Sequence, residues 1–272
     1  MMTMKKTIII TGSSSGIGYE TAKYFAEKGW NVIATMRHPE KRENRFQGKN
    51  NIEMCHLDVL DQKSINDCIE YVVKKYGSVD VFLNNAGYAV VGPFEDLSKE
   101  QIEQQFDTNL FGIFETTRGI IPIFRKQKKG LIINLSSMGG RIGFPAYSIY
   151  NSTKWALEGF SESLRYELEP FGIRIKLIEP GVVKTDFYGR SMVKAESSEE
   201  YRKFTERVMK NMENASVEMP PIEVAKVIYQ AATDGSNKLR YPVGSDAKML
   251  TTMRKILPSS TFEYFFRSRL VK

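Results

Sequence analysis

Short apolar runs alternate with longer amphipathic stretches along most of the chain. The runs predict buried strands at Thr7–Thr11, Val32–Met36, Ile52–Leu57, Val79–Leu83, Leu131–Leu135 and Ile173–Ile178, with a short last strand at Leu239–Val243. The stretches between them predict helices at Ile17–Lys28, Gln62–Tyr76, Lys99–Lys126, Ser148–Glu169 and Pro221–Ala232. Such alternation is typical of a doubly wound α/β fold, in which helices cover both faces of a parallel sheet. A ligand of this fold lies across the carboxyl ends of the strands.

Residues 186–216 interrupt the alternation, because they are too long for an ordinary connection between a strand and a helix. Long insertions of this kind usually serve as lids or binding loops. Apolar side chains recur at helical spacing within it, which predicts a helix at 199–213; they are Tyr201, Phe204, Val208 and Met212. Two compatible interpretations remain open: the helix caps the core, or it is a mobile lid that closes over a substrate.

Composition favours one soluble globular domain. The chain has 272 residues, 42% hydrophobic and 26% charged, without a linker, a repeat or a low-complexity segment. No apolar run is long enough for a signal peptide or a membrane span, which predicts a cytoplasmic protein with no integral membrane part. The two histidines, His38 and His56, and the two cysteines, Cys55 and Cys68, lack metal-site spacing, so we expect neither a bound metal nor histidine catalysis.

The net charge of +7 is concentrated near the C-terminus. Residues 238–272 contain eight basic and two acidic side chains together with Phe262, Tyr264, Phe265 and Phe266. This segment either touches an acidic membrane or nucleic acid, or packs its aromatic rings on the domain and leaves its basic groups in solvent. No nucleic-acid-binding motif accompanies it, which favours packing and predicts no nucleic-acid partner.

A glycine-rich turn follows the first predicted strand and opens the first predicted helix. Gly12, Gly16 and Gly18 are spaced Gly-x-x-x-Gly-x-Gly, unlike the Gly-x-Gly-x-x-Gly of the standard dinucleotide fingerprint. Glycines let the backbone approach a pyrophosphate closely, and the following helix directs its N–H groups at it. The turn by itself is also compatible with a tight connection, but its position between strand and helix favours a dinucleotide site.

Tyr150 and Lys154 are four residues apart at the start of a predicted helix, so both side chains emerge from one face. A lysine ammonium beside a phenol favours the phenolate, so we expect Lys154 to lower the pKa of Tyr150. A tyrosine of this kind can give a proton to a carbonyl oxygen or take one from a hydroxyl. The pair alone is common on solvated helix faces and gains weight only from the motifs around it.

Those motifs follow one another in a characteristic order. After the glycine turn come Asn84-Asn85-Ala86-Gly87, Asn109, Ser136-Ser137, Tyr150-x-x-x-Lys154 and Pro180-Gly181. In this order they resemble the short-chain dehydrogenase/reductase family over roughly residues 5–190. Ser-Met-Gly-Gly at 137–140 and Pro-Gly-Val-Val-Lys-Thr at 180–185 are similar to the branch of hydroxysteroid and retinol dehydrogenases.

The resemblance implies four catalytic residues. Tyr150 would be the general acid/base, and Lys154 would depress its pKa and bind the nicotinamide ribose. Ser137 would hold the substrate oxygen, with Ser136 as the competing choice. Asn109 would kink its helix and support a proton-relay water.

The resemblance also implies a set of cofactor-binding residues, in which Asp58 accepts from the adenine amine and Thr185 bonds the nicotinamide amide. The set comprises Gly12, Ser14, Ser15, Gly16, Ile17, Gly18, Arg37, Asp58, Val59, Asn85, Ala86, Gly87, Tyr150, Lys154, Pro180, Gly181, Val183 and Thr185.

The end of the second strand predicts which dinucleotide binds. An acidic residue there would bond the ribose 2′-hydroxyl of NAD, whereas this chain has Met36 followed by Arg37. A guanidinium is suited to a phosphate, so NADP(H) is favoured over NAD. The family's other NADP marker, a basic residue before the second glycine, is replaced by Ser15.

We therefore expect an NADP(H)-dependent oxidoreductase that interconverts a hydroxyl and a carbonyl. Candidate pocket residues are mostly apolar, which favours a lipophilic alcohol, aldehyde or ketone; they are Tyr88–Val91, Phe144–Tyr147, Phe187–Tyr188 and Met192–Val193. The alternative is a catalytically silent NADP-binding regulator or scaffold, which the presence of both Tyr150 and Lys154 disfavours. A sugar-nucleotide epimerase would have another glycine spacing and a longer C-terminal part.

Family members commonly pair two long helices across a two-fold axis, which implies a homodimer or homotetramer. The matching helices here are Lys99–Lys126 and Ser148–Glu169. Phe111, Phe114, Phe160 and Leu164 exceed the apolar groups that one sheet-facing stripe per helix needs. Alternatively, the C-terminal segment covers this face within one chain.

Overall fold

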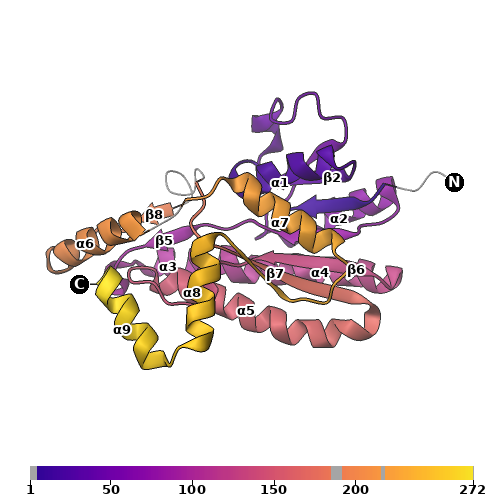
Figure 1. Cartoon of the computed structure of the whole chain (residues 1–272). Helices are drawn as coiled ribbons and strands as arrows, with labels where there is room; N and C mark the ends of the chain where they lie inside the picture. Colours follow the sequence, from indigo (N-terminus) through magenta and orange to yellow (C-terminus); the bar gives the residue numbers. More distant parts are fainter. Residues whose placement is uncertain (1–4, 185–191, 216–217, 272) are drawn as a thin grey trace.

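The computed structural model describes residues 5–184, 192–215 and 218–271. Its centre is a parallel seven-stranded sheet with the strand order β3-β2-β1-β4-β6-β7-β9 (Figure 1). The strands are β1 Thr7–Ile10, β2 Asn31–Met36, β3 Ile52–His56, β4 Val81–Asn84, β6 Gly130–Leu135, β7 Ile173–Pro180 and β9 Arg240–Val243. Every strand predicted from the sequence is present, with ends within two residues of the prediction. The doubly wound α/β fold is therefore confirmed.

Helices cover both faces of this sheet, because successive side chains of a strand point to opposite faces. Ile8 and Ile10 of β1 pack into one core with α1 and α7, whereas Ile9 packs into the other core with α2, α4 and α5. These helices are α1 Gly16–Glu27, α2 Gln62–Tyr76, α4 Gly112–Gln127, α5 Ser148–Leu168 and α7 Pro221–Thr233. The continuous apolar runs of the sequence thus reflect burial on both sides.

The order of the strands reverses beside β1. The chain runs outward through β2 to β3, then returns to place β4 on the other side of β1. The loops after β1 and β4 therefore diverge, which leaves a crevice at the carboxyl ends of these strands. The glycine turn and Asn85–Gly87 both begin at this crevice.

The helix predicted at Lys99–Lys126 is divided into α3 Lys99–Phe106, a π-helical turn Asp107–Phe111 and α4. Asn109, inside the π-helical turn, is fully buried. Its Oδ1 accepts from the backbone N–H of Tyr88 at 3.1 Å, and its Nδ2 donates to the Tyr88 carbonyl at 2.8 Å. The irregular turn lies where the resemblance implies a kink.

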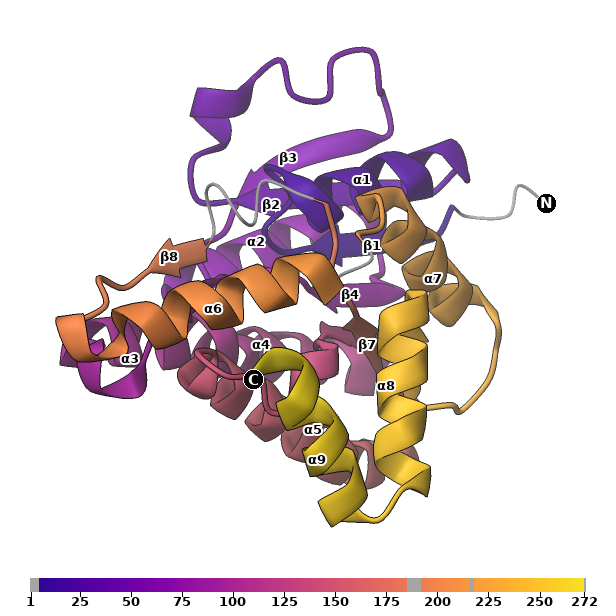
Figure 2. The same ribbon diagram turned by 60° about the vertical axis from the view of Figure 1, so that its left-hand side comes forward.

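A small second sheet, which the sequence did not predict, pairs β5 Ala89–Val91 with β8 Met192–Lys194. These strands precede α6 Glu199–Ala215, the helix expected at 199–213, which crosses the front of the molecule in Figure 2. Two hydrogen bonds anchor its start. Ser198 N–H donates to Asp96 Oδ2 at 3.1 Å, and the Tyr201 hydroxyl donates to Glu95 Oε2 at 3.0 Å.

The basic C-terminal segment forms two helices that the sequence analysis did not assign, α8 Ser245–Ile256 and α9 Ser259–Leu270. Phe262 is buried, and the ring of Phe266 packs against that of Phe144 at 5.3 Å between centroids. Asn211 of α6 donates to the Leu270 carbonyl, so α9 and α6 are joined directly (Figure 2). This arrangement agrees with the packing interpretation of the segment. Among the described residues, no helix has the length and apolar character needed to span a membrane.

Candidate active site

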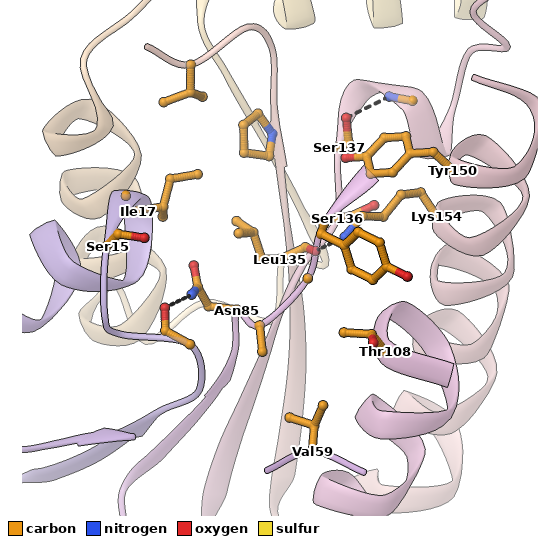
Figure 3. A pocket seen from close by; sticks show the side chains of 18 of the residues that line it. Ser15, Ile17, Val59, Asn85, Thr108, Leu135, Ser136, Ser137, Tyr150 and Lys154 are labelled. Atoms are coloured by element: carbon orange, nitrogen blue, oxygen red, sulfur yellow. Dashed lines mark hydrogen bonds between the residues drawn. The ribbon is translucent and has the colours of Figure 1, made fainter. Parts of the chain in front are cut away.

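A cavity of about 750 Å³ lies at the carboxyl ends of the central strands. The start of α1, with Ser15 and Ile17, faces Ser137, Tyr150 and Lys154 across it (Figure 3). The predicted site residues that line it are Gly12, Ser14, Ser15, Gly16, Ile17, Arg37, Asp58, Val59, Asn85, Ala86, Gly87, Ser137, Tyr150, Lys154, Pro180, Gly181 and Val183. Gly18 and Asn109 do not line it and instead support the residues that do. Thr185 lies outside the described residues.

The glycine turn leaves no space for a side chain at Gly12 or at Gly18. Gly12 has a φ of +68°, and a Cβ there would lie 2.8 Å from the Ala86 Cα. A Cβ on Gly18 would lie 2.5 Å from Asn85 Nδ2 and from the Gly12 carbonyl oxygen. The first N–H groups of α1 have no partner within the helix and lie at the cavity, where they suit an anionic pyrophosphate. The turn therefore fits a dinucleotide.

Thr11 ties the glycine turn to the loop after β4. Its Oγ1 accepts from the N–H groups of Asn85 and Ala86 at 2.9 and 3.0 Å. Asn85 Nδ2 in turn donates to the Thr11 carbonyl at 2.8 Å. This role of Thr11 was not predicted from the sequence, although its position between the apolar strand and Gly12 was the available signal.

The end of β2 combines a buried and an exposed residue. Met36 is buried, whereas Arg37 is exposed at the edge of the cavity. His56 Nδ1 donates to the Arg37 carbonyl at 2.8 Å, which fixes the backbone there. Within the described part of the chain, no carboxylate forms an ion pair with the Arg37 guanidinium. On the next loop, Asp58 Oδ1 accepts from the Leu60 N–H at 3.1 Å.

The side chain of Ser137 lies beside that of Tyr150, where it lowers the pKa of the phenol (Figure 3). Ser137 Oγ also accepts from the Gly139 N–H at 3.0 Å, because Ser137 caps the short 3-10 turn Met138–Gly140. The Ser136 hydroxyl also lies at the cavity wall but is buried without a hydrogen-bond partner among the described residues. The structure thus brings Ser137, and not Ser136, against the tyrosine.

The protonation of Tyr150 and Lys154 is governed by burial. Burial raises the pKa of Tyr150, and the neighbouring Ser137 side chain only partly opposes it. Burial lowers the pKa of Lys154 to about 8, against the charge of Glu158. Lys154 Nζ donates to the Leu135 carbonyl at 2.8 Å and lies 5.7 Å from the centroid of the Tyr150 ring. The expectation that Lys154 lowers the pKa of Tyr150 is therefore wrong for this structure, because burial raises that pKa and Ser137, not Lys154, is the group that opposes it.

Asp246 shapes the Pro180-Gly181 segment and was missed by the sequence analysis. Its Oδ2 accepts from the Val182 N–H at 2.9 Å, and a side chain on Gly181 would collide with its carboxyl group. Asp246 lies in the first turn of α8. A residue so distant along the chain carries no sequence signal that links it to Gly181.

The remaining cavity wall is mixed apolar and polar. Of the candidate pocket residues, Tyr88, Phe144 and Tyr147 line it. Residues 89–91, Met192 and Val193 instead belong to the small sheet, in which Val193 is exposed. Pro145 and Ala146 do not line the cavity, and residues 187–188 lie outside the described part. The structure adds Gln104, Thr108, Asn151 and Met212.

Comparison with known proteins gives the family. The model of the short chain dehydrogenase family matches residues 6–196. The uncharacterized oxidoreductase YusZ of Bacillus subtilis (strain 168) is 42% identical over 98% of this chain and 99% of its own length. The 3-ketodihydrosphingosine reductase of Bacteroides thetaiotaomicron is 37% identical over 66% of this chain and 65% of its own. Human retinol dehydrogenase 8 is 36% identical over 73% of this chain and 66% of its own length.

Solved structures agree with this family. A short-chain dehydrogenase from Streptomyces avermitilis superposes with a TM-score of 0.85 and 31% identity, over 98% of this chain and 97% of that one. ElxO with NADP bound superposes with a TM-score of 0.77 and 29% identity, over 90% of this chain and 100% of that one. The chain belongs to the short-chain dehydrogenase family and is an oxidoreductase of that family.

Proposed function

We propose that the chain is an NADP(H)-dependent oxidoreductase that interconverts a hydroxyl and a carbonyl on a lipophilic substrate, with Tyr150 as the general acid/base. One observation carries this proposal: the side chains of Ser137 and Tyr150 lie against each other at the wall of the cavity that also contains Lys154 and the glycine turn (Figure 3). Two hydroxyl groups are thus placed where one substrate oxygen can contact both.

The side chains suit a proton transfer to a carbonyl oxygen. Because burial raises the pKa of Tyr150, the phenol carries its proton at neutral pH and can donate it to a bound ketone or aldehyde. Ser137 donates a second hydrogen bond to the same oxygen. The nicotinamide, when bound, supplies the hydride in reduction and accepts it in oxidation. In the oxidative direction the phenolate form of Tyr150 would take the proton of the alcohol.

Lys154 would serve two purposes in this site. With a pKa of about 8, Lys154 is charged in roughly nine-tenths of the molecules at pH 7. The ammonium can then bind the ribose hydroxyls of the cofactor and stabilise the phenolate that Tyr150 becomes after donating its proton. Asn109 supports this side of the cavity, since its Nδ2 approaches Thr153 Oγ1 on α5 at 3.5 Å.

Two features support NADP(H) over NAD. Arg37 lies at the cavity edge without a carboxylate partner among the described residues, and an acidic residue is missing from the end of β2. ElxO, a solved relative, has NADP bound.

A lipophilic substrate is supported by the wall that Phe144, Tyr147 and Met212 provide. Relatives named for a retinol and a sphingosine derivative point to the same class. Long apolar substrates gain most from such a wall, because each buried methylene contributes about 0.8 kcal/mol.

We further propose a cytoplasmic homodimer or homotetramer. Phe111 and Trp155 are about half exposed, at 50% and 49%, on the helices that family members commonly pair. The apolar surplus is smaller than the sequence suggested, since Leu164 is buried in the core and Phe114 packs on Phe160 at 4.4 Å between ring centroids.

The test of the proposed function is Tyr150→Phe, which removes one oxygen and little volume. Turnover should fall by about 10²–10⁴ while NADPH still binds. Tyr147→Phe is the matched control, because its ring also lines the cavity, 6.1 Å from the Tyr150 ring centroid. Activity is followed by NADPH absorbance with steroids, retinoids, aliphatic aldehydes and sugars. Near-normal turnover of Tyr150→Phe would refute the assignment, and NADPH binding without turnover on any substrate would favour a silent regulator.

A further inference from the structure

A cluster of buried charges lies behind Lys154, outside the cavity. Glu158 follows Lys154 by one turn of α5 and is only 4% exposed. Glu179, near the end of β7 and just before Pro180, is 1% exposed. Residues with opposite charge come from two other elements, Arg240 from β9 and Arg141 after the 3-10 turn that Ser137 caps.

The arginines hold the two carboxylates in place. Arg240 Nε donates to Glu158 Oε2 at 2.8 Å and lies 3.5 Å from Glu179 Oε1. Arg141 Nη1 donates to Glu179 Oε1 at 3.4 Å. Arg240 also reaches outward, where its Nη2 donates to Glu162 Oε2 at 2.6 Å. The guanidinium of Arg240 therefore spans from solvent to the buried acids.

One oxygen of Glu158 remains uncommitted. Its Oε1 is buried and has no hydrogen-bond partner among the described residues. The side chain is close to the active-site backbone, because a Cβ on Gly140 would lie 3.0 Å from Glu158 Cγ, 2.8 Å from Ser136 Oγ and 3.1 Å from the Lys154 carbonyl oxygen. Glu158 thus packs directly behind the wall of the cavity.

The charge of Glu158 acts on Lys154. Burial lowers the pKa of Lys154, and Glu158 is the charged group that opposes this effect. Burial and the Glu158 carboxylate together raise the pKa of Glu179 to about 7. Tyr150 faces Lys154 from the same helix, and Arg141 and Arg240 belong to the cluster behind it; the causes that shift the pKa of Lys154 are burial and Glu158.

We propose that Glu158 is a positioning residue for the reaction: its buried carboxylate, held by Arg240, keeps Lys154 charged and so preserves cofactor binding and proton transfer by Tyr150. The inference rests on the proposed function. Without Glu158, desolvation would leave Lys154 neutral over more of the physiological pH range. A lone pair on neutral Lys154 could neither attract the ribose hydroxyls as strongly nor stabilise a phenolate.

The experiment is a titration of NADPH binding by fluorescence between pH 6.5 and pH 10. The 2′-phosphate is essentially fully charged above pH 7, so the loss of affinity at higher pH reports the loss of a proton from the protein. For the wild-type protein, affinity should fall as the pH rises through the pKa of Lys154, about 8. In Glu158→Gln the midpoint of this fall should move to lower pH by about one unit, as expected for removal of a charge one helical turn away. The pH profile of kcat should move in the same direction.

Glu162→Gln is the matched control. Glu162 is also on α5 and also pairs with Arg240, but its side chain is 50% exposed and a further turn from Lys154. Its midpoint should match that of the wild-type protein. Glu158→Asp keeps the charge, so its midpoint should lie close to that of the wild-type protein. This variant gives the comparison if Glu158→Gln folds poorly.

Two results would overturn the inference while the proposed function stands. One is a Glu158→Gln midpoint equal to that of the wild-type protein, including a uniform loss of affinity at every pH, which would show a packing role. The other is wild-type NADPH binding that does not change with pH. A wild-type protein that binds neither NADPH nor NADP⁺ would instead refute the proposed function itself.

Discussion

Replacing Arg37 by alanine tests how this chain selects its cofactor. Arg37 follows the buried Met36 at the end of β2, and its exposed side chain lies at the edge of the cavity. The guanidinium forms no ion pair with a carboxylate within the described residues, so binding a phosphate would not require it to release another partner. The full free energy of the contact between Arg37 and a 2′-phosphate should therefore contribute to the affinity for NADPH.

The size of the effect depends on the position of Arg37, which is exposed but lies at the edge of the cavity. Charge-assisted hydrogen bonds contribute about 1.5–3 kcal/mol, whereas fully exposed ion pairs contribute about 0.2–1 kcal/mol. The contact between Arg37 and a dianionic phosphate at the edge of the cavity should contribute an energy in the lower to middle part of the first range. Arg37→Ala should therefore weaken NADPH binding by about ten- to a hundredfold. NADH lacks the phosphate, so its dissociation constant should stay nearly unchanged.

Fluorescence titrations with NADPH and NADH measure both constants, at about 50 and 300 mM salt, because screening should reduce the NADPH preference. Lys41→Ala is the matched control, since Lys41 is an exposed cation in the same loop that does not line the cavity. Equal losses for NADPH and NADH would show that Arg37 does not recognise the phosphate. An equal effect of Lys41→Ala would indicate a general attraction by the basic loop.

Two other predictions concern the substrate and the assembly. Met212→Ala, on α6, should raise KM for lipophilic substrates by about tenfold and leave NADPH affinity unchanged, because Met212 lines the cavity. Met249→Ala, on the exposed face of α8, is the control. An unchanged KM of Met212→Ala would support a helix that only caps the core. Light scattering after size exclusion should give a mass near 62 kDa or a multiple for the 31.1 kDa chain. Trp155→Glu should dissociate this assembly while Ile256→Glu, at the 72% exposed Ile256, should not; a stable monomer of the wild-type protein at micromolar concentration would contradict the proposed pairing.

The sequence predicted the central sheet well because each strand is buried on both faces. Continuous runs such as Thr7–Ile10 have no other stable location than the middle of a covered parallel sheet. Gly12 and Gly18 were equally informative, since the close approach of Ala86 and Asn85 allows no other residue there. These features are local, so they can be recognised in one stretch of sequence.

Features that depend on contacts between distant residues were missed or misjudged. The small sheet of β5 and β8 joins strands too short to show a period, and α8 lay in a segment recognised only by its charge and its aromatic residues. Asp246 accepts a hydrogen bond from Val182, which lies 64 positions earlier in the chain. No local pattern could have linked them.

The chain's residue types and spacings determined its fold class, its glycine turn and its pairing of Tyr150 with Lys154. Only the tertiary structure decided how protons are distributed in the site. The sequence predicted a tyrosine made more acidic by lysine, whereas burial raises the pKa of Tyr150 and lowers that of Lys154 to about 8. Desolvation depends on everything packed around a group, including Glu158 behind the cavity wall, and the spacing of two residues along a helix contains no information about it.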